Sequence, residues 1–230
     1  MKKSYWAILV IILILIIDQA SKIYIKTHLG YGEGFDILGL KWAKIYFVEN
    51  KGMAYGMEIG GEYGKLILSL FRIIMIIVLV YFLVKLIQAN EKLSLILSFS
   101  LIIAGALGNI IDSAFYGMIF SETPRFHGGV AQLFPPEGGY SSFLHGKVVD
   151  MFYFPIIDTY LPEWVPIWGG ERFIFFQPVF NVADSAITVG VVLLLLFNRS
   201  YFTKKDKKNP ATHTEQEKIS LEKNPEENII

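Results

Sequence analysis

Four long stretches with few charged residues constrain this chain more than any other feature of its sequence. They lie at about residues 5–25, 66–87, 93–116 and 179–201. An apolar helix of about 20 residues is long enough to cross a bilayer. The hydrophobic share of the composition, 53%, agrees with a membrane protein. We therefore predict an integral membrane α-helical protein with four transmembrane helices.

The N-terminal stretch also has features of a cleavable signal peptide. Lys2 and Lys3 precede an uncharged run over residues 5–17, which is the pattern of a basic region followed by an apolar one. Asp18 and the glutamine after it, however, interrupt the sequence where a cleavage region should begin, and no clean small-residue cleavage signal follows. We therefore favour a retained helix.

The segments outside the spans differ from one another in pattern. Apolar residues recur with period two over residues 38–47, which predicts strands with one buried face and hence a small extramembrane β element, a cradle, at about 35–58. Residues 117–178 are rich in Gly, Pro and aromatic residues without a helical period, and we predict an ordered loop region on the membrane surface. Residues 203–230 are polar and charged, which predicts a disordered tail after a membrane domain of residues 1–202.

Lysines favour one orientation in the membrane. Four spans place both termini on one side, and lysines near residues 2–3, 85–92 and 204–208 flank that side. The positive-inside rule assigns such a side to the cytoplasm, although further lysines between residues 26 and 65 lie opposite. We predict that both termini are cytoplasmic and that the β element and the loop region face outward.

The composition disfavours several classes of function. The sequence has no cysteine, and its four histidines are not spaced as a metal-binding pair, so a thiol nucleophile is excluded and a zinc hydrolase is disfavoured. A net charge of zero gives no indication of a nucleic-acid partner. We predict no metal, no cofactor and no nucleic-acid partner.

Polar residues near one end of three stretches are candidates for a shared site. Asp18, Asp112 and Asp184 lie about 20, 28 and 30 Å from the inner surface at about 1.5 Å per helical residue, in the outer third of a core about 30 Å thick. Asn109 and Asn181 each precede one of these aspartates by three residues and would share its helical face. A carboxylate inside a span is costly and indicates a functional site. We predict one shallow polar site that opens outward.

Carboxylates are the groups available for hydrolysis at such a site. Two carboxylates that lie close together share one proton, so the ionised partner can activate water while the protonated partner donates to the scissile carbonyl. Spacing alone does not choose this pair. Asp158 has the sequence context of a turn or cap residue. The candidate carboxylates are Asp18, Asp112, Asp150, Asp158 and Asp184.

Two other functions fit a membrane protein with carboxylates in its spans. A carboxylate-relay transporter would use them to carry protons, but its carboxylates should lie near the midplane, often between repeated halves. Here they lie shallow, and no repeat is visible. A non-catalytic scaffold would leave the shared depth of the carboxylates unexplained. We therefore favour a peptidase, with the transporter as the alternative.

Five short motifs along the chain identify a family. They are, in order, Asp18-Gln19 with Lys22, Asn50-Lys51-Gly52-Met53-Ala54-Tyr55-Gly56, Gly108-Asn109-Ile110-Ile111-Asp112, Val148-Val149-Asp150-Met151-Phe152 and Phe180-Asn181-Val182-Ala183-Asp184. In this order, and on a layout of four spans, they resemble the motifs of lipoprotein signal peptidases (signal peptidase II) over about residues 5–200. Any one of these motifs alone would be a weak signal.

The resemblance implies an intramembrane aspartic endopeptidase of the bacterial inner membrane. Such an enzyme removes the signal peptide from diacylglyceryl-modified prolipoproteins, cutting just before the lipidated cysteine. It implies a monomer in contact with membrane lipids, with its active site on the periplasmic side and both termini in the cytoplasm. The β element and the loop region would then be periplasmic.

The resemblance also implies roles for individual residues. Asp150 and Asp184 match the catalytic dyad of the family. Asp18 and Lys22 match a structural pair in the first helix. Further positions match residues that line the site, support it or help the cradle to grip substrate, and these are Asn50, Gly52, Asn109, Asp112 and Asn181.

The chain departs from the family pattern in two places. The family usually has an arginine directly after the aspartate of the Gly-Asn-x-x-Asp motif, and here Ser113 stands in that position. The chain between the last three motifs is also longer than usual, and we interpret residues 120–147 and 158–176 as surface insertions that could cover the site as a lid. Three arginines elsewhere are candidates to replace the missing one: Arg72, Arg125 and Arg172.

Overall fold

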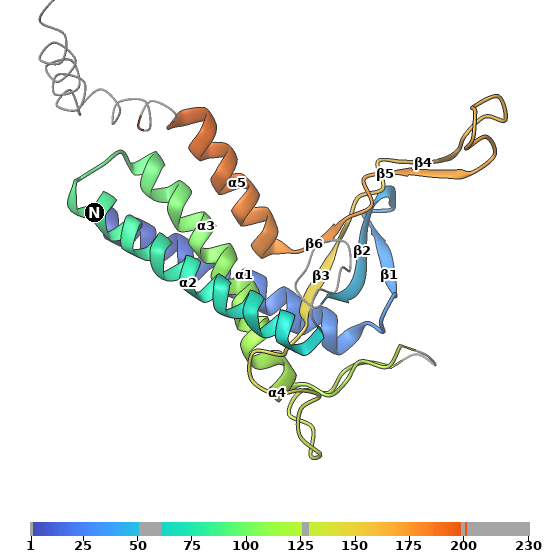
Figure 1. Ribbon diagram of the computed structural model, residues 1–230, viewed down its shortest axis with the longest axis horizontal. Coiled ribbons are helices and arrows are strands. Elements are labelled where there is room, and N and C mark those ends of the chain that lie inside the picture. The colour runs from blue at the N-terminus through green and yellow to red at the C-terminus, as the bar shows by residue number, and fades with distance from the viewer. Residues whose placement is uncertain (1, 51–60, 126–128, 199–200, 202–230) are drawn as a thin grey trace, which may run out of the picture.

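The computed structural model describes residues 2–50, 61–125, 129–198 and 201 of the chain. A short π-helical turn and a last helical turn continue the third helix without a break. The helices are α1 (Lys3–His28), α2 (Gly61–Gln88), α3 (Leu93–Ile111), the π turn (Asp112–Tyr116), α4 (Gly117–Ile119) and α5 (Val182–Phe197), as Figure 1 shows.

Three helices among the described residues are long and apolar enough to cross a membrane. They cover Lys3–His28, Tyr63–Gln88 and Leu93–Ile119. Large apolar side chains are exposed along α1 and α2, as expected where lipid rather than water surrounds a helix. α5 is apolar but has only 16 residues, so a fourth complete span stays a prediction.

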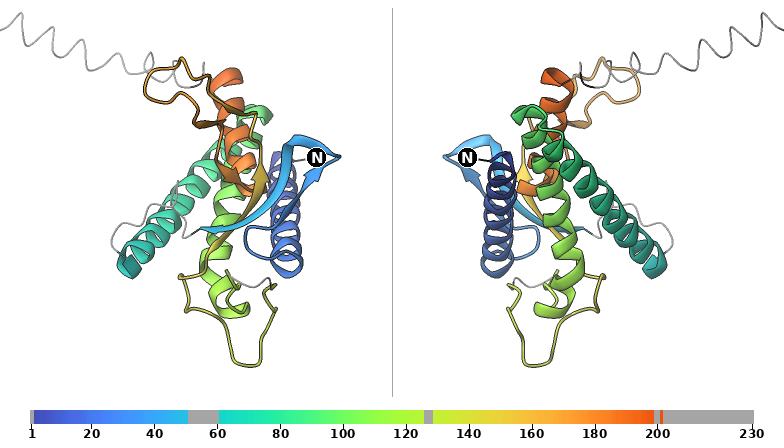
Figure 2. Two further views of the ribbon diagram at one scale, coloured as in Figure 1. Left: turned by 90° about the vertical axis from the view of Figure 1, so that its right-hand side faces the viewer. Right: turned by 90° about the vertical axis from the view of Figure 1, so that its left-hand side faces the viewer.

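α3 is the centre of the helical part. It packs against α1, α2 and α5, and Figure 2 shows α1 and α2 on opposite sides of it. Two glycines allow the close approach of α5 and α1. A Cβ atom on Gly105 would lie 2.2 Å from the carbonyl oxygen of Ala183 in α5, and one on Gly108 would lie 2.5 Å from Asp18 Oδ2 in α1. Small residues let helix backbones approach closely in lipid. The glycines thus bring the polar ends of α1, α3 and α5 together.

A small antiparallel sheet lies at one end of the helices. Its strand order is β1-β2-β3-β6, with β1 at Gly34–Ile37, β2 at Leu40–Asn50, β3 at Val148–Tyr153 and β6 at Val179–Phe180. Strands are present near residue 40 as predicted, but the predicted buried face is wrong in its first half, because Leu38, Leu40 and Trp42 are exposed. The rest of the predicted β element, residues 51–58, lies outside the described residues. β3 comes from the predicted loop region. The register pairs Val48 with Asp150 and Asn50 with Val148, so the polar end of β2 lies beside Asp150.

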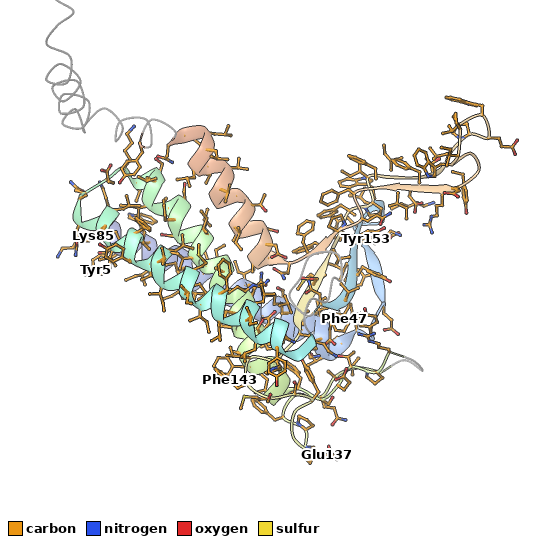
Figure 3. The ribbon with its side chains drawn as sticks, in the orientation of Figure 1. Tyr5, Phe47, Lys85, Glu137, Phe143 and Tyr153 are labelled. Atoms are coloured by element: carbon orange, nitrogen blue, oxygen red, sulfur yellow. The ribbon has the colours of Figure 1, made fainter. Side chains whose placement is uncertain are left out.

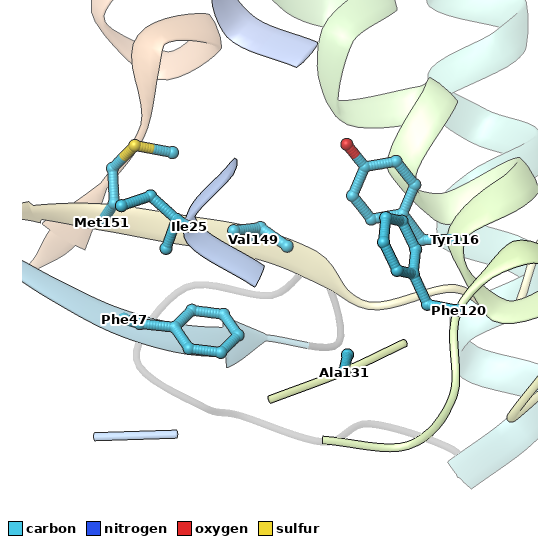
Figure 4. Close-up of a cluster of buried hydrophobic side chains, with 7 residues drawn as sticks. All are labelled: Ile25, Phe47, Tyr116, Phe120, Ala131, Val149 and Met151. Carbon is cyan, nitrogen blue, oxygen red and sulfur yellow. The ribbon is translucent and has the colours of Figure 1, made fainter. Parts of the chain in front are cut away.

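A cluster of buried side chains fixes this sheet to the helices. Figure 4 shows residues of β2 and β3 facing the end of α1 and the end of α3. Burying one large apolar side chain stabilises a fold by about 1.5–3 kcal/mol, so the cluster holds β3, and with it Asp150, in a fixed place. Its members are Ile25, Phe47, Tyr116, Phe120, Ala131, Val149 and Met151.

A buried charged network fastens the first insertion, residues 120–147, to the same region. Lys26 Nζ donates to a carboxylate oxygen of Glu49 and, over 2.9 Å, to Thr123 Oγ1. Lys147 lies 3.6 Å from the other carboxylate oxygen of Glu49. In Figure 3 this insertion, marked by Glu137 and Phe143, lies at the opposite end of the helices from Tyr5 and Lys85.

Two predictions about elements were wrong. The fourth helix begins at Val182 rather than at residue 179, because β6 pairs with β3 and Asn181 caps the helix. Asp158 is not a turn or cap residue but lies in β4 (Ile157–Tyr160), which pairs with β5 (Arg172–Phe175). This hairpin projects away from the helices in Figure 1, so the second insertion does not form a lid here.

Candidate active site

Four aspartates from four different elements meet where the sheet joins the helices. Asp18 comes from α1, Asp112 from the end of α3, Asp150 from β3 and Asp184 from the first turn of α5. Three of the four are buried, and Asp184 is partly exposed. Their hydrogen bonds divide them into two groups.

The first group is an ion cluster around Lys22. Its Nζ lies 2.9 Å from Asp18 Oδ2 and 2.9 Å from Asp112 Oδ2, and it donates over 3.0 Å to Asn109 Oδ1. The three charged side chains are completely buried. A buried ion pair persists only when its remaining donors and acceptors are also satisfied. Gln19 contributes here, because its Nε2 donates to Asp112 Oδ1 over 2.9 Å.

The start of α5 fixes the position of Asp184. Asp184 N donates to Asn181 Oδ1 over 2.9 Å, and Asn181 N donates to Asp184 Oδ2 over 3.2 Å, which is a reciprocal capping box. Asp18 adds a second cap from α1, because its Oδ1 accepts from Ala183 N over 2.9 Å. Negative charges are stabilised at a helix N-terminus. Asn181 is therefore the cap of α5, not part of its first turn as we had predicted.

The second group consists of Asp150 and Asp184, which are held by amides. Asn181 Nδ2 donates to Asp150 Oδ1 over 2.7 Å, and Asn50 Nδ2 donates to Asp150 Oδ2 over 2.8 Å. Asn109 Nδ2 donates to Asp184 Oδ1 over 2.8 Å. Asn181 Nδ2 also donates to Asn109 Oδ1 over 3.1 Å, so the two amides connect the two carboxylates.

Burial changes the protonation of Asp150. The side chain is only 3% exposed, and burial together with the nearby charge of Asp184 raises the pKa of Asp150 to about 7. The hydrogen bonds from Asn50 and Asn181 act in the opposite direction. Near neutral pH, Asp150 therefore exchanges a proton while lying next to a second carboxylate.

Arg72 is the arginine that faces these carboxylates. Its charge interacts with those of Asp184, Asp150 and Asp112. Ser69 and Ile76, three residues before and four residues after it, are both buried and share its face of α2. Ser69 also donates to the carbonyl of the loop that leads into β3.

The other two candidate arginines lie elsewhere. Arg125 lies over the ring of Tyr31, 5.3 Å from its centroid. Arg172 forms an ion pair with Asp158 in the β4–β5 hairpin. Ser113, which stands where the family usually has arginine, is buried and donates to the backbone oxygen of Asn109 over 3.1 Å.

Other residues of the region were placed differently from our predictions or were missed. Asn50 is the last residue of β2, within the predicted β element, and Gly52 lies outside the described residues. We missed Lys26, which is completely buried. The spacing i, i+4, i+8 of Asp18, Lys22 and Lys26 on one face of α1 could have revealed it. Within the described ranges, no group of three or more His, Cys, Asp and Glu side chains could hold a metal ion.

Comparison with known proteins identifies the family that has this arrangement. The model of the family described as signal peptidase (SPase) II matches residues 10–199 of the chain. The chain belongs to the signal peptidase II family. The match spans α1 to the end of α5 and includes the five motifs, so it covers all the residues of the site described above.

Several proteins named lipoprotein signal peptidase are similar to this member of the signal peptidase II family. The protein from Porphyromonas gingivalis is 52% identical over 187 residues, which cover 81% of this chain and 79% of the relative. The protein from Amoebophilus asiaticus is 35% identical, with coverage of 92% and 86%. The protein from Staphylococcus aureus is 30% identical, with coverage of 90% and 98%.

Solved structures of bacterial membrane enzymes share the fold. One, determined by the in meso method at 2.3 Å resolution, aligns with a TM-score of 0.57 and 25% identity over 90% of this chain and 93% of that chain. Another, at 1.9 Å resolution, aligns with a TM-score of 0.53 and 28% identity, with coverage of 83% and 90%. Together with the apolar helices, these similarities identify the chain as a multi-pass membrane protein.

Proposed function

We propose that Asp150 and Asp184 are the catalytic dyad with which this chain removes signal peptides from prolipoproteins. Membership of the signal peptidase II family gives the reaction, because this family consists of aspartic peptidases that process lipoprotein precursors. The resemblance of the surrounding motifs implies this choice of residues. The single structural observation that carries it is the amide bridge from Asp150 through Asn181 and Asn109 to Asp184.

The ion cluster argues against Asp18 and Asp112 as the reacting pair. Both accept from Lys22 and are completely buried. Lys22 occupies an oxygen of each carboxylate, and neither side chain is open to the water molecule that hydrolysis requires. Asp150 and Asp184 are held instead by neutral amides, which orient a carboxylate without removing its ability to titrate. Asp184, moreover, is partly exposed and can be reached by water.

The raised pKa of Asp150 supports a division of labour within the dyad. Asp150 begins with the proton, and we assign the role of the carboxylate to Asp184. Asp184 takes a proton from a water molecule while the oxygen of that water attacks the scissile carbonyl carbon. Asp150 protonates the carbonyl oxygen. In the second half, Asp184 returns its proton to the leaving nitrogen, the C–N bond breaks, and a hydroxyl of the tetrahedral intermediate gives its proton to Asp150. The dyad ends as it began.

Arg72 fits a supporting role in this chemistry. Its positive charge on α2 interacts with those of Asp184 and Asp150 and would stabilise the negative charge that the dyad carries. It would supply from another helix the charge that the family usually places directly after Asp112. Arg72 does not react itself, so we assign it as a positioning residue.

The remaining features of the proposal follow from the family and the charge pattern. The substrate would be a diacylglyceryl-modified precursor, cut just before its lipidated cysteine. The enzyme would be a monomer of the inner membrane with four spans, cytoplasmic termini and a site that opens to the periplasm. Asn50 and Gly52, at the end of β2 and beyond it, would help to hold the substrate.

Substitution of the dyad tests this proposal. Asp150→Asn and Asp184→Asn should each lower the rate of cleavage of a lipidated precursor by about 10³-fold or more, measured with purified enzyme by the mobility shift of the product. Asp158→Asn is the matched control, since Asp158 is an exposed aspartate of the hairpin, and it should keep full activity. Normal cleavage by either dyad variant would refute the assignment of that residue.

A further inference from the structure

The β4–β5 hairpin has one apolar face and one polar face. In an antiparallel pair, residues directly opposite each other point to the same face. On the polar face, Arg172 Nε and Nη2 donate to Asp158 over 2.7 and 2.6 Å. Tyr160 lies opposite Arg172, and Ile174, the one aliphatic residue of this face, lies opposite Asp158. The apolar face consists of two opposite pairs, Ile157 with Phe175 and Thr159 with Phe173.

The tip of the hairpin carries large apolar side chains that are almost fully exposed. Trp164, Ile167 and Trp168 are 80%, 87% and 58% exposed. The tip is ordered by its own backbone, because Gly170 N donates to the carbonyl of Leu161 over 2.9 Å and further turns lie between these two residues. The tip therefore displays its tryptophans on a folded turn.

The position of the hairpin brings it to the edge of the membrane. β5 ends at Phe175 and the apolar helix α5 begins at Val182, so the base of the hairpin can lie no more than about 25 Å from that helix even if the linking chain is fully extended. Figure 1 shows the hairpin running crosswise to α5, not along its axis. A hairpin in this place and direction is close enough to a membrane-crossing α5 to reach the surface of the bilayer.

We propose that the apolar face and the tip of the hairpin dock onto the interface of the bilayer that the helices cross, on the side where the sheet lies. A two-stranded hairpin alone is marginally stable in water, and tryptophans are enriched at the membrane–water interface, where the ring is partly in lipid. The Arg172–Asp158 face would then point to water. Since β6 links the hairpin to Asn181, this docking would hold β3 and the start of α5 at a fixed height above the lipid.

Site-specific fluorescence quenching in lipid tests this proposal. Each variant carries a single tryptophan in a background in which Trp6, Trp42, Trp164 and Trp168 are replaced by Phe. The matched pair is Phe173→Trp on the apolar face and Tyr160→Trp on the polar face. Each variant is reconstituted at one copy per nanodisc, without substrate. The lipids carry bromine on the acyl chain close to the headgroup.

The proposal predicts at least about twofold stronger quenching of Phe173→Trp than of Tyr160→Trp. A third variant keeps the native Trp168 as its only tryptophan and should be quenched as strongly as Phe173→Trp. Because Trp168 is native, this variant controls for distortion by the introduced side chains. Equal quenching on both faces would overturn the proposal. Absence of quenching at both Phe173→Trp and Trp168 would also overturn the proposal. The apolar face of the hairpin would then bind a protein substrate or a second copy of the chain.

Discussion

Asp112 and Asp150 are both buried aspartates within the same polar region, yet their surroundings differ. Asp112 accepts from Lys22 and Gln19, whereas Asp150 accepts from the amides of Asn50 and Asn181. An ammonium partner forms an ion pair with a carboxylate, whereas amide partners orient a carboxylate without supplying an opposite charge. The comparison teaches that burial alone does not distinguish the carboxylate that we propose as catalytic from its neighbour. The kind of donor that satisfies each carboxylate does.

Lys22→Met tests the difference between the two groups and should have the largest effect on stability. It would leave Asp18 and Asp112 buried without their cation, and breaking a buried ion pair costs about 3–5 kcal/mol. We expect a large drop in the free energy of unfolding, measured by thermal or denaturant unfolding in detergent. Asp150→Asn is the control and should unfold near the wild-type temperature. Similar losses of stability in both variants would mean that the two groups do not differ as we describe.

Arg72→Gln tests how far the proposed dyad depends on a nearby positive charge. Removal of the charge that faces Asp184 and Asp150 should lower kcat about tenfold, which corresponds to about 1.4 kcal/mol, and should move the pH optimum. Arg72→Lys should restore most of the rate. Steady-state kinetics over pH separate this from a structural role, because a purely structural residue would lower the rate without moving the optimum.

The pH dependence of stability provides a smaller effect, and comparison with Asp150→Asn isolates the part that belongs to Asp150. Its pKa is raised from 3.8 to about 7 in the folded protein, so between these values the folded state binds a proton that the unfolded state has lost. The stabilisation is fully present below pH about 3.8 and disappears as the pH rises through about 7. We expect the Tm of the wild type to fall from pH 5 to pH 8, and to fall less in Asp150→Asn. Parallel curves for the two proteins would contradict the raised pKa.

Much of the helical part could be predicted from the sequence because length and hydropathy determine it. The stretches at about 66–87 and 93–116 correspond to α2 and to α3 with its extension. The fourth helix was predicted to begin too early, since Val179 and Phe180 are as apolar as the helix that follows. Only their pairing with β3 separates them from it, and such long-range pairing leaves no local signal.

The site could be predicted from the sequence only in part. Helical depth brought Asp18, Asp112 and Asp184 to one level, and the structure does bring them together. Asp150 could not be chosen by depth, because it lies on a strand whose place depends on the packing of Phe47 and Val149. Its choice came from the resemblance of the motif around it.

The most direct test of the dyad is a titration of Asp150 itself, by the carboxyl carbon signal of labelled aspartate in NMR, with Asp150→Asn to assign it. We predict that Asp150 titrates near pH 7 in the wild type. In Asp184→Asn it should titrate at a lower pH, because the neighbouring negative charge that raises its pKa is gone. An Asp150 that titrates near pH 4 in both proteins would contradict the coupled pair on which the proposed mechanism depends.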